Sequence, residues 1–209
     1  ESLDILSRII PLNRQNFKSG KNIFDWTVPK EWKVNEAYII DPNGKKICDF
    51  AKNNLHLVSH SIPFKGELSL KNLKKHLHSY PKLPNALPYL TSYFDKRWGF
   101  CISHNELKRL PQGKYKVVVN TELYNGELVT ADYVLKGENP EEIMFTSYLC
   151  HPSMANNELS GPLTLAFLFD KTVDNNFWFL CAISQKKTQR LYNYLLRSCF
   201  PQPCPFFWQ

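Results

Sequence analysis

The spacing of hydrophobic positions changes along the chain, and each change predicts a different kind of structure. Apolar residues recur at helical intervals over residues 3–10, and Pro11 follows them, so this stretch predicts a short amphipathic helix. From about residue 32 to residue 135, β-branched and aromatic residues are frequent, which favours strands. Turn signals at Asn43-Gly44 and Asn125-Gly126 lie inside this region. The region therefore predicts strands joined by hairpins at these two turns.

One short helix is predicted inside the β-rich region. Leu70, Leu73 and Leu77 share one helical face. Ser69 is suited to cap the first turn, and Pro81 lies just beyond the last one. The sequence therefore predicts a helix between these two residues.

After Pro140 the pattern becomes that of an α/β unit. The segment "EIMFTSYL" (residues 142–149) is almost continuously apolar, as in a strand covered on both faces. A polar loop follows, and residues 161–173 predict a buried helix with Pro162 in its first turn. Strand, loop and helix in this order form half of a parallel α/β unit, and ligands gather at the carboxyl ends of such strands. His151 lies at that end.

His151 and a carboxylate in the same loop could supply part of a metal site. Imidazole is a common zinc ligand, and carboxylates complete many hydrolytic sites. From the residues alone two interpretations stay open, a metal site and a structural His-Pro turn. Because neighbouring residues on a strand point to opposite faces, Cys150 is interpreted as a buried, inert thiol. Ser160-Gly161 lacks the G-x-S-x-G pattern of serine hydrolases.

Composition narrows the function classes. With 209 residues, of which 43% are hydrophobic, the chain can bury the core of one domain or two small ones. The net charge is +7, but the lysines are spread along the chain, so we expect a solvated basic surface and no nucleic-acid partner. The six cysteines include no C-x-x-C pair, and the sequence shows neither a leader segment nor an apolar run of membrane-spanning length. We therefore expect a cytoplasmic protein with free thiols and no membrane partner.

Four stretches carry a resemblance to a known family: "FDWTVPKEW" (24–32), "NLHLVSHSIPFKGELSL" (54–70), "HLHSYPKLPNALPYLTSYFDKRWGFCISHNE" (76–106) and "CHPSMANNELSGP" (150–162). Over these stretches the chain resembles bacterial aminopeptidase-like proteins associated with polysaccharide biosynthesis. The resemblance implies an α/β fold, namely a partial zinc-aminopeptidase-like mixed sheet with helices that is interrupted by an inserted β-rich domain. The expected boundaries are 1–28 and 136–209 for the α/β domain and 29–135 for the insert.

The resemblance also implies zinc, with His151 as the first ligand of a two-metal site. In the family an aspartate bridges the two ions, but Asn157 stands at that position here, and a neutral amide cannot bridge two cations as a carboxylate does. Glu158 is the adjacent carboxylate that could replace it. His151, Asn157 and Glu158 are therefore the candidate metal positions. The resemblance fades after Phe169, so the chain is interpreted as a truncated or divergent member.

The resemblance therefore implies a metal-dependent aminopeptidase or amidase for a peptide- or amide-containing small substrate, linked to surface-polysaccharide biosynthesis. Because ligands are changed or missing, the chain is expected to be inactive alone. The alternative is a non-catalytic glycan- or protein-binding module, and the sequence also allows an oligomer. Such a module would present the aromatic residues Tyr89, Tyr93, Phe94, Trp98 and Phe100, although aromatic rings more often fill small β cores.

Overall fold

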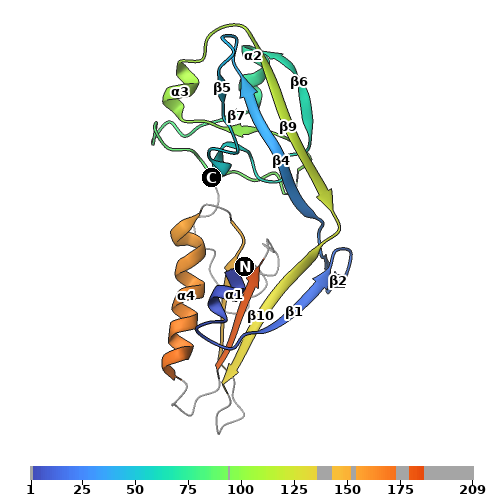
Figure 1. Cartoon of the computed structure of the whole chain (residues 1–209), viewed down its shortest axis with the longest axis vertical. Helices are drawn as coiled ribbons and strands as arrows, with labels where there is room; N and C mark the ends of the chain where they lie inside the picture. The colour runs from blue at the N-terminus through green and yellow to red at the C-terminus, as the bar shows by residue number, and fades with distance from the viewer. Residues whose placement is uncertain (1, 94, 136–142, 152–153, 173–178, 186–209) are drawn as a thin grey trace. The chain divides into compact units, whose positions relative to one another are not determined.

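The protein has a mixed α/β structure. The computed structural model in Figure 1 describes residues 2–93, 95–135, 143–151, 154–172 and 179–185. Phe94 and the sequence after residue 185 lie outside these ranges. Contacts between residues divide the chain into two compact units: the first is Glu1–Pro29 with Gly126–Gln209, and the second is Lys30–Asn125. No helix in the described ranges is long and apolar enough to cross a membrane.

The first unit contains a mixed sheet with the strand order β1-β10-β12-β11. Its strands are β1 (Asn13–Lys18), β10 (Glu127–Leu135), β12 (Phe179–Gln185) and β11 (Ile143–Leu149). β10 pairs antiparallel with β1 and β12, whereas β11 and β12 are parallel. The helix α4 (Ala155–Thr172) lies between β11 and β12 in the sequence. This arrangement confirms the parallel strand–helix unit predicted around His151. A separate hairpin consists of β2 (Asn22–Ile23) and β3 (Trp26–Thr27).

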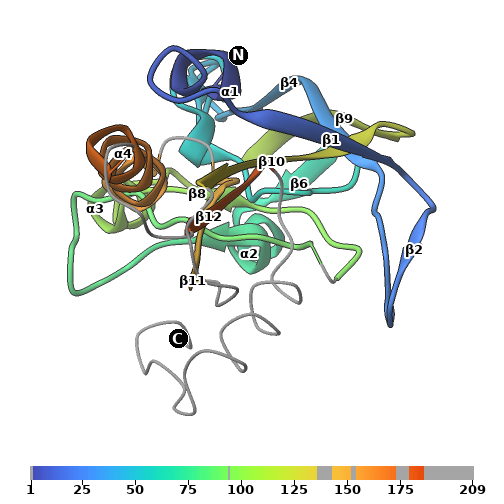
Figure 2. The ribbon, with the colours of Figure 1, turned by 90° about the horizontal axis from the view of Figure 1, so that it is seen from below.

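The core of the first unit lies between the sheet and two helices, α1 (Ser2–Leu6) and α4. Figure 2 shows α4 beside β11 and β12. Helical spacing brings Leu3 and Leu6 of α1 to the core, as the sequence predicted, although the regular helix ends before Pro11. The buried core residues are Leu3, Leu6, Ile10, Ala131, Leu165, Ala166 and Phe169.

α4 begins at Ala155, well before the predicted start at Gly161. Pro162 therefore lies inside the helix, and the prediction that placed it in the first turn was wrong. Polar residues over 155–160 favoured a loop, but in the structure they form the exposed side of the first helical turns, while Glu158 alone among them is buried. Gly161 allows this part of α4 to approach β11, because a Cβ at Gly161 would lie 2.2 Å from Ser147 Oγ.

The second unit is built on an antiparallel sheet with the strand order β5-β4-β9-β6. These strands are β5 (Lys46–Ile47), β4 (Glu31–Ile40), β9 (Lys114–Tyr124) and β6 (Phe64–Ser69). A parallel pair joins β7 (Leu77–His78) to β8 (Phe100–Cys101). The helical segments are η1 (Asn54–His56), α2 (Leu70–Leu73), η2 (Lys74–His76) and α3 (His104–Lys108).

Two local predictions for the β-rich region need correction. The hairpin at Asn43-Gly44 is confirmed, because β4 pairs antiparallel with β5. The hairpin at Asn125-Gly126 is wrong: β9 pairs with β4 and β6, whereas β10 pairs with β1 and β12. The predicted helix begins as expected, with Ser69 Oγ accepting a hydrogen bond from Asn72 N at 3.4 Å, but α2 ends at Leu73. Leu77 reaches the core from strand β7 instead.

Candidate metal centre

The candidate site lies where β11 ends and α4 begins. β11 ends at Leu149, and Cys150 and His151 follow directly. The chain then turns into α4, with Met154 N donating to His151 O at 3.3 Å. Glu158 N in turn donates to Met154 O at 3.1 Å, which places Glu158 in the first turn of the helix. Asn157 and Glu158 are thus helical residues and do not belong to an irregular loop.

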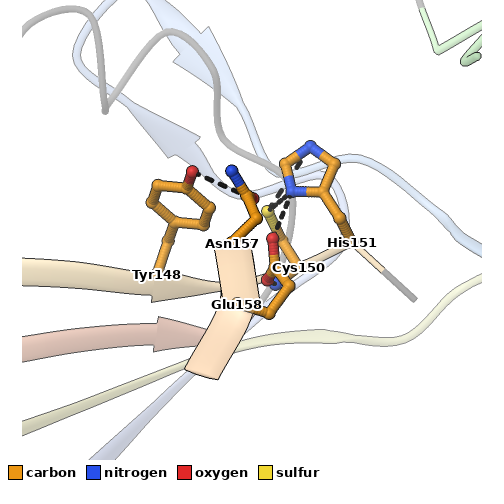
Figure 3. Close-up of polar contacts among 5 residues, drawn as sticks. All are labelled: Tyr148, Cys150, His151, Asn157 and Glu158. Atoms are coloured by element: carbon orange, nitrogen blue, oxygen red, sulfur yellow. Dashed lines mark hydrogen bonds and ion pairs between the residues drawn. The ribbon is translucent and has the colours of Figure 1, made fainter. Parts of the chain in front are cut away.

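Three side chains converge at this point (Figure 3). His151 Nδ1 lies 2.6 Å from Glu158 Oε1 and 2.9 Å from Cys150 Sγ. The second carboxylate oxygen, Glu158 Oε2, accepts a hydrogen bond from the backbone N–H of Cys150. Glu158 is only 7% exposed, whereas Cys150 and His151 are half-buried. The sulfur, imidazole and carboxylate ligand atoms all lie within 4.8 Å of one another.

The environment of Glu158 favours its charged form. Burial acts to raise the pKa of this carboxyl, but hydrogen bonds from His151 and from the backbone of Cys150 and His151 lower it, and the net result is a pKa below 4.5. A buried carboxylate that is ionised and hydrogen-bonded through both oxygens has a fixed orientation. The negative charge of Glu158 is therefore held against the His151 ring.

Asn157 points to a different partner. Its side chain is exposed, and its Oδ1 accepts a hydrogen bond from the Tyr148 hydroxyl at 3.2 Å. The Tyr148 ring also contacts His151 edge-on, with centroids 5.8 Å apart. Successive residues of a helix are rotated by about 100°, so Asn157 and Glu158 cannot both face His151. Of the three predicted metal positions, the structure brings His151 and Glu158 together and leaves Asn157 beside Tyr148.

Cys150 was misjudged from the sequence. Cys150 lies beyond the last residue of β11. The rule that neighbouring strand side chains point to opposite faces therefore does not apply to Cys150 and His151. Its sulfur is half-buried and contacts the His151 ring, in contrast to the inert, buried thiol that we predicted. The adjacent Cys-His pair after an apolar strand was the signal that could have identified it.

The geometry does not match a catalytic triad. In a triad, the nucleophile and the orienting carboxylate bind opposite nitrogens of the histidine ring. Here Glu158 contacts Nδ1, and Cys150 Sγ is also closer to Nδ1, at 2.9 Å, than to Nε2, at 3.9 Å. The chemistry of the donors fits zinc instead, because imidazole, carboxylate and thiolate are its usual ligands in proteins.

Two other histidines, His56 and His76, and two of the candidate aromatic residues, Trp98 and Phe100, have structural roles in the second unit. His56 Nδ1 lies 2.9 Å from Cys101 O, and the His76 ring stacks on Trp98 at 3.9 Å between centroids. Trp98 is 8% exposed and Phe100 is fully buried. These two rings fill the core and form no binding surface, so they do not support the alternative of an aromatic binding module, whereas Tyr89 and Tyr93 are half-buried.

Comparison with known proteins finds a relative that is similar over most of the chain. It is 40% identical over 195 residues to a polysaccharide biosynthesis protein with an aminopeptidase-like domain from Clostridium acetobutylicum. The chain is therefore similar to this aminopeptidase-like protein over nearly all of its own length. The match covers 93% of the chain but 42% of the relative. Within it, residues 31–122 match a family described as a domain of unknown function (DUF2172).

Solved structures agree with the aminopeptidase-like fold. A peptidase crystal structure from Clostridium acetobutylicum has 37% sequence identity and a TM-score of 0.82, and the match covers 94% of this chain and 47% of that one. The zinc aminopeptidase BSAP from Bacillus subtilis has a TM-score of 0.55 at 11% identity, over 87% of this chain and 54% of that one. At this identity BSAP supports the fold alone.

Proposed function

We propose that this aminopeptidase-like chain carries part of a zinc site of the amidase or aminopeptidase type, built on His151 and Glu158. The observation that carries the proposal is the 2.6 Å approach of His151 Nδ1 to Glu158 Oε1 at the carboxyl end of β11. Ligand sites of α/β sheets form at this end of the strands. Glu158, one residue after the expected bridging position, supplies the carboxylate of this partial site, while the bridging position itself holds the neutral Asn157.

Each residue has a defined task in the proposed site. His151 offers a ring nitrogen, and Glu158 offers a negative charge that offsets part of the charge of a cation. The backbone N–H of Cys150 holds Glu158 Oε2, so that Oε1 faces His151. A zinc ion would supply Lewis-acid polarisation of an amide carbonyl and of the attacking water.

We further propose that the chain alone does not hydrolyse amides. A two-metal site needs a carboxylate between its ions, but the Asn157 side chain is neutral and hydrogen-bonded to Tyr148. Among the described residues, Cys150, His151 and Glu158 form the one group of three or more side chains with metal-ligand spacing. The name of the 40%-identical relative suggests polysaccharide biosynthesis as the setting. A peptide- or amide-containing small molecule as the substrate, and the cytoplasm as the location, are part of the same proposal.

The second unit is proposed to be a domain inserted into the aminopeptidase-like one. Its support is that Lys30–Asn125 lies in the sequence between the two parts of the first unit.

Hydrolysis assays test the proposed function. The purified chain is incubated with amino-acid amides and chromogenic aminoacyl anilides, with zinc and with a chelator, beside the Asn157→Asp variant. We expect no chelator-sensitive hydrolysis by the unmodified chain. Turnover that zinc restores after chelation would show that the chain is a complete enzyme and would refute the proposed inactivity.

A further inference from the structure

Cys150 occupies a position that the proposed zinc site does not yet explain. Its sulfur lies 2.9 Å from His151 Nδ1, and its own backbone N–H binds the carboxylate of Glu158. Cys150 therefore binds Glu158 through its backbone and contacts His151 through its side chain. Any residue except proline at this position could make the backbone contact, so the approach of the sulfur to His151 is the observation that bears on the side chain.

The three ligand atoms are grouped closely enough for one ion, although they lie nearer to one another than the ligands of a bound ion do. Zinc binds sulfur at about 2.3 Å and nitrogen or oxygen at about 2.0–2.2 Å, so tetrahedral ligands lie roughly 3.5 Å apart. The observed separations from His151 Nδ1 are 2.6 Å to Glu158 Oε1 and 2.9 Å to Cys150 Sγ. An outward shift of about 1 Å or less at each ligand would admit an ion. Glu158 keeps its backbone hydrogen bond through Oε2 during such a shift.

We propose that Cys150, His151 and Glu158 together bind a single thiophilic divalent cation, with Cys150 as a thiolate ligand. This inference rests on the zinc site of the proposed function and changes its nature, from half of a two-ion carboxylate site to a one-ion site containing sulfur. Binding converts the Cys150 thiol to a thiolate, and its proton is released to solvent. The sulfur supplies the second negative charge that Asn157 cannot provide.

The sulfur ligand predicts a definite metal preference. Thiolate favours zinc, cadmium and cobalt, whereas sites built from carboxylates and carbonyls also accept magnesium or manganese. The site should therefore bind cadmium and zinc in preference to magnesium.

Thiolate-to-metal charge transfer tests the inference directly. The purified, reduced chain is titrated with cobalt(II) and with cadmium(II), and the ultraviolet charge-transfer band is recorded with the number of ions bound. We expect one ion per chain and a band that Cys150→Ala abolishes, with an affinity at least about 100-fold lower, since even residues that only support a ligand cost 10–100-fold. Cys150→Ser should keep weak binding without the band.

A matched cysteine variant controls for nonspecific thiol binding. Cys101 is buried in the second unit, where burial raises the pKa of its thiol to about 12, so Cys101→Ala should keep both the band and the affinity. If the unmodified chain binds the ion without a charge-transfer band, or if Cys150→Ala binds it equally well, the Cys150 ligand is refuted while the His151–Glu158 site stands. If the unmodified chain binds no ion, both proposals fail. Circular dichroism of each variant shows whether it is folded.

Discussion

Replacing Glu158 with alanine is expected to lower the free energy of unfolding of the first unit by about 2–3 kcal/mol. The side chain is 7% exposed and makes two charge-assisted contacts, one with His151 Nδ1 at 2.6 Å and one with the backbone N–H of Cys150. Hydrogen bonds to a charged group contribute about 1.5–3 kcal/mol each, but the half-buried partners regain some hydration in the variant. The negative charge in the first turn of α4 adds about 0.3–1 kcal/mol through the helix dipole.

The assay is urea unfolding in the presence of a chelator, so that no metal contributes, together with hydrogen exchange at the Cys150 amide. Glu158→Gln keeps the shape and part of the hydrogen bonding. Its free energy of unfolding should therefore fall by about half as much as that of Glu158→Ala. The control is Asn157→Ala at the neighbouring, exposed position, for which we expect a change within about 0.5 kcal/mol. If Glu158→Ala is as stable as this control and its Cys150 amide stays protected, then the hydrogen bonds of Glu158 do not hold the site together.

Three further predictions test the packing and electrostatics. Gly161→Ala should cost about 1–3 kcal/mol in urea unfolding, because the new Cβ would lie 2.2 Å from Ser147 Oγ, and Ser147→Ala in the same chain should restore part of the loss. Trp98→Ala should cost about 3–5 kcal/mol, because its ring is in the core; a variant of unchanged stability would revive the binding-surface interpretation. Burial acts to raise the pKa of Asp49, but the ion pair with Lys46 at 3.1 Å and backbone hydrogen bonding lower it below 3.8. Its stabilisation is therefore present above pH 3.8 and lost as the pH falls through the lowered pKa, so Asp49→Asn should flatten the acid side of the stability profile; an unchanged profile would contradict this.

Several helices and strands of the fold could be predicted from the sequence, but the pairing of the strands could not. The apolar run before His151 predicted β11, and its parallel partner β12 confirmed the α/β unit. Asn125 and Gly126 only link β9 to β10 and form no turn, and the strands on their two sides join different sheets. A turn signal reports only local backbone geometry, whereas strand partners are chosen by long-range burial, which one sequence does not show.

The sequence predicted which residues form the candidate site better than it predicted how their side chains are arranged. His151 was singled out because it follows the apolar strand at its carboxyl end, and the resemblance implied that it is a zinc ligand; the strand was expected to be covered on both faces, but β11 contains no buried residue. The resemblance placed Asn157 at the bridging position with Glu158 as its possible replacement, and residues 150–160 were treated as a loop, so the sequence did not show which of the two faces His151. Once α4 begins at Ala155, helical rotation turns Glu158 inward and Asn157 outward. Cys150 was missed because strand alternation was extended one residue too far.

The zinc content of the chain tests the central claim most directly. The full chain is dialysed against buffered zinc, and bound metal is counted for the unmodified protein, for His151→Ala and for His104→Ala, a histidine variant in the second unit. The account predicts one zinc ion per chain in the unmodified protein and in His104→Ala, and none in His151→Ala. A chain that binds no zinc, or a His151→Ala variant that keeps it, would contradict the account.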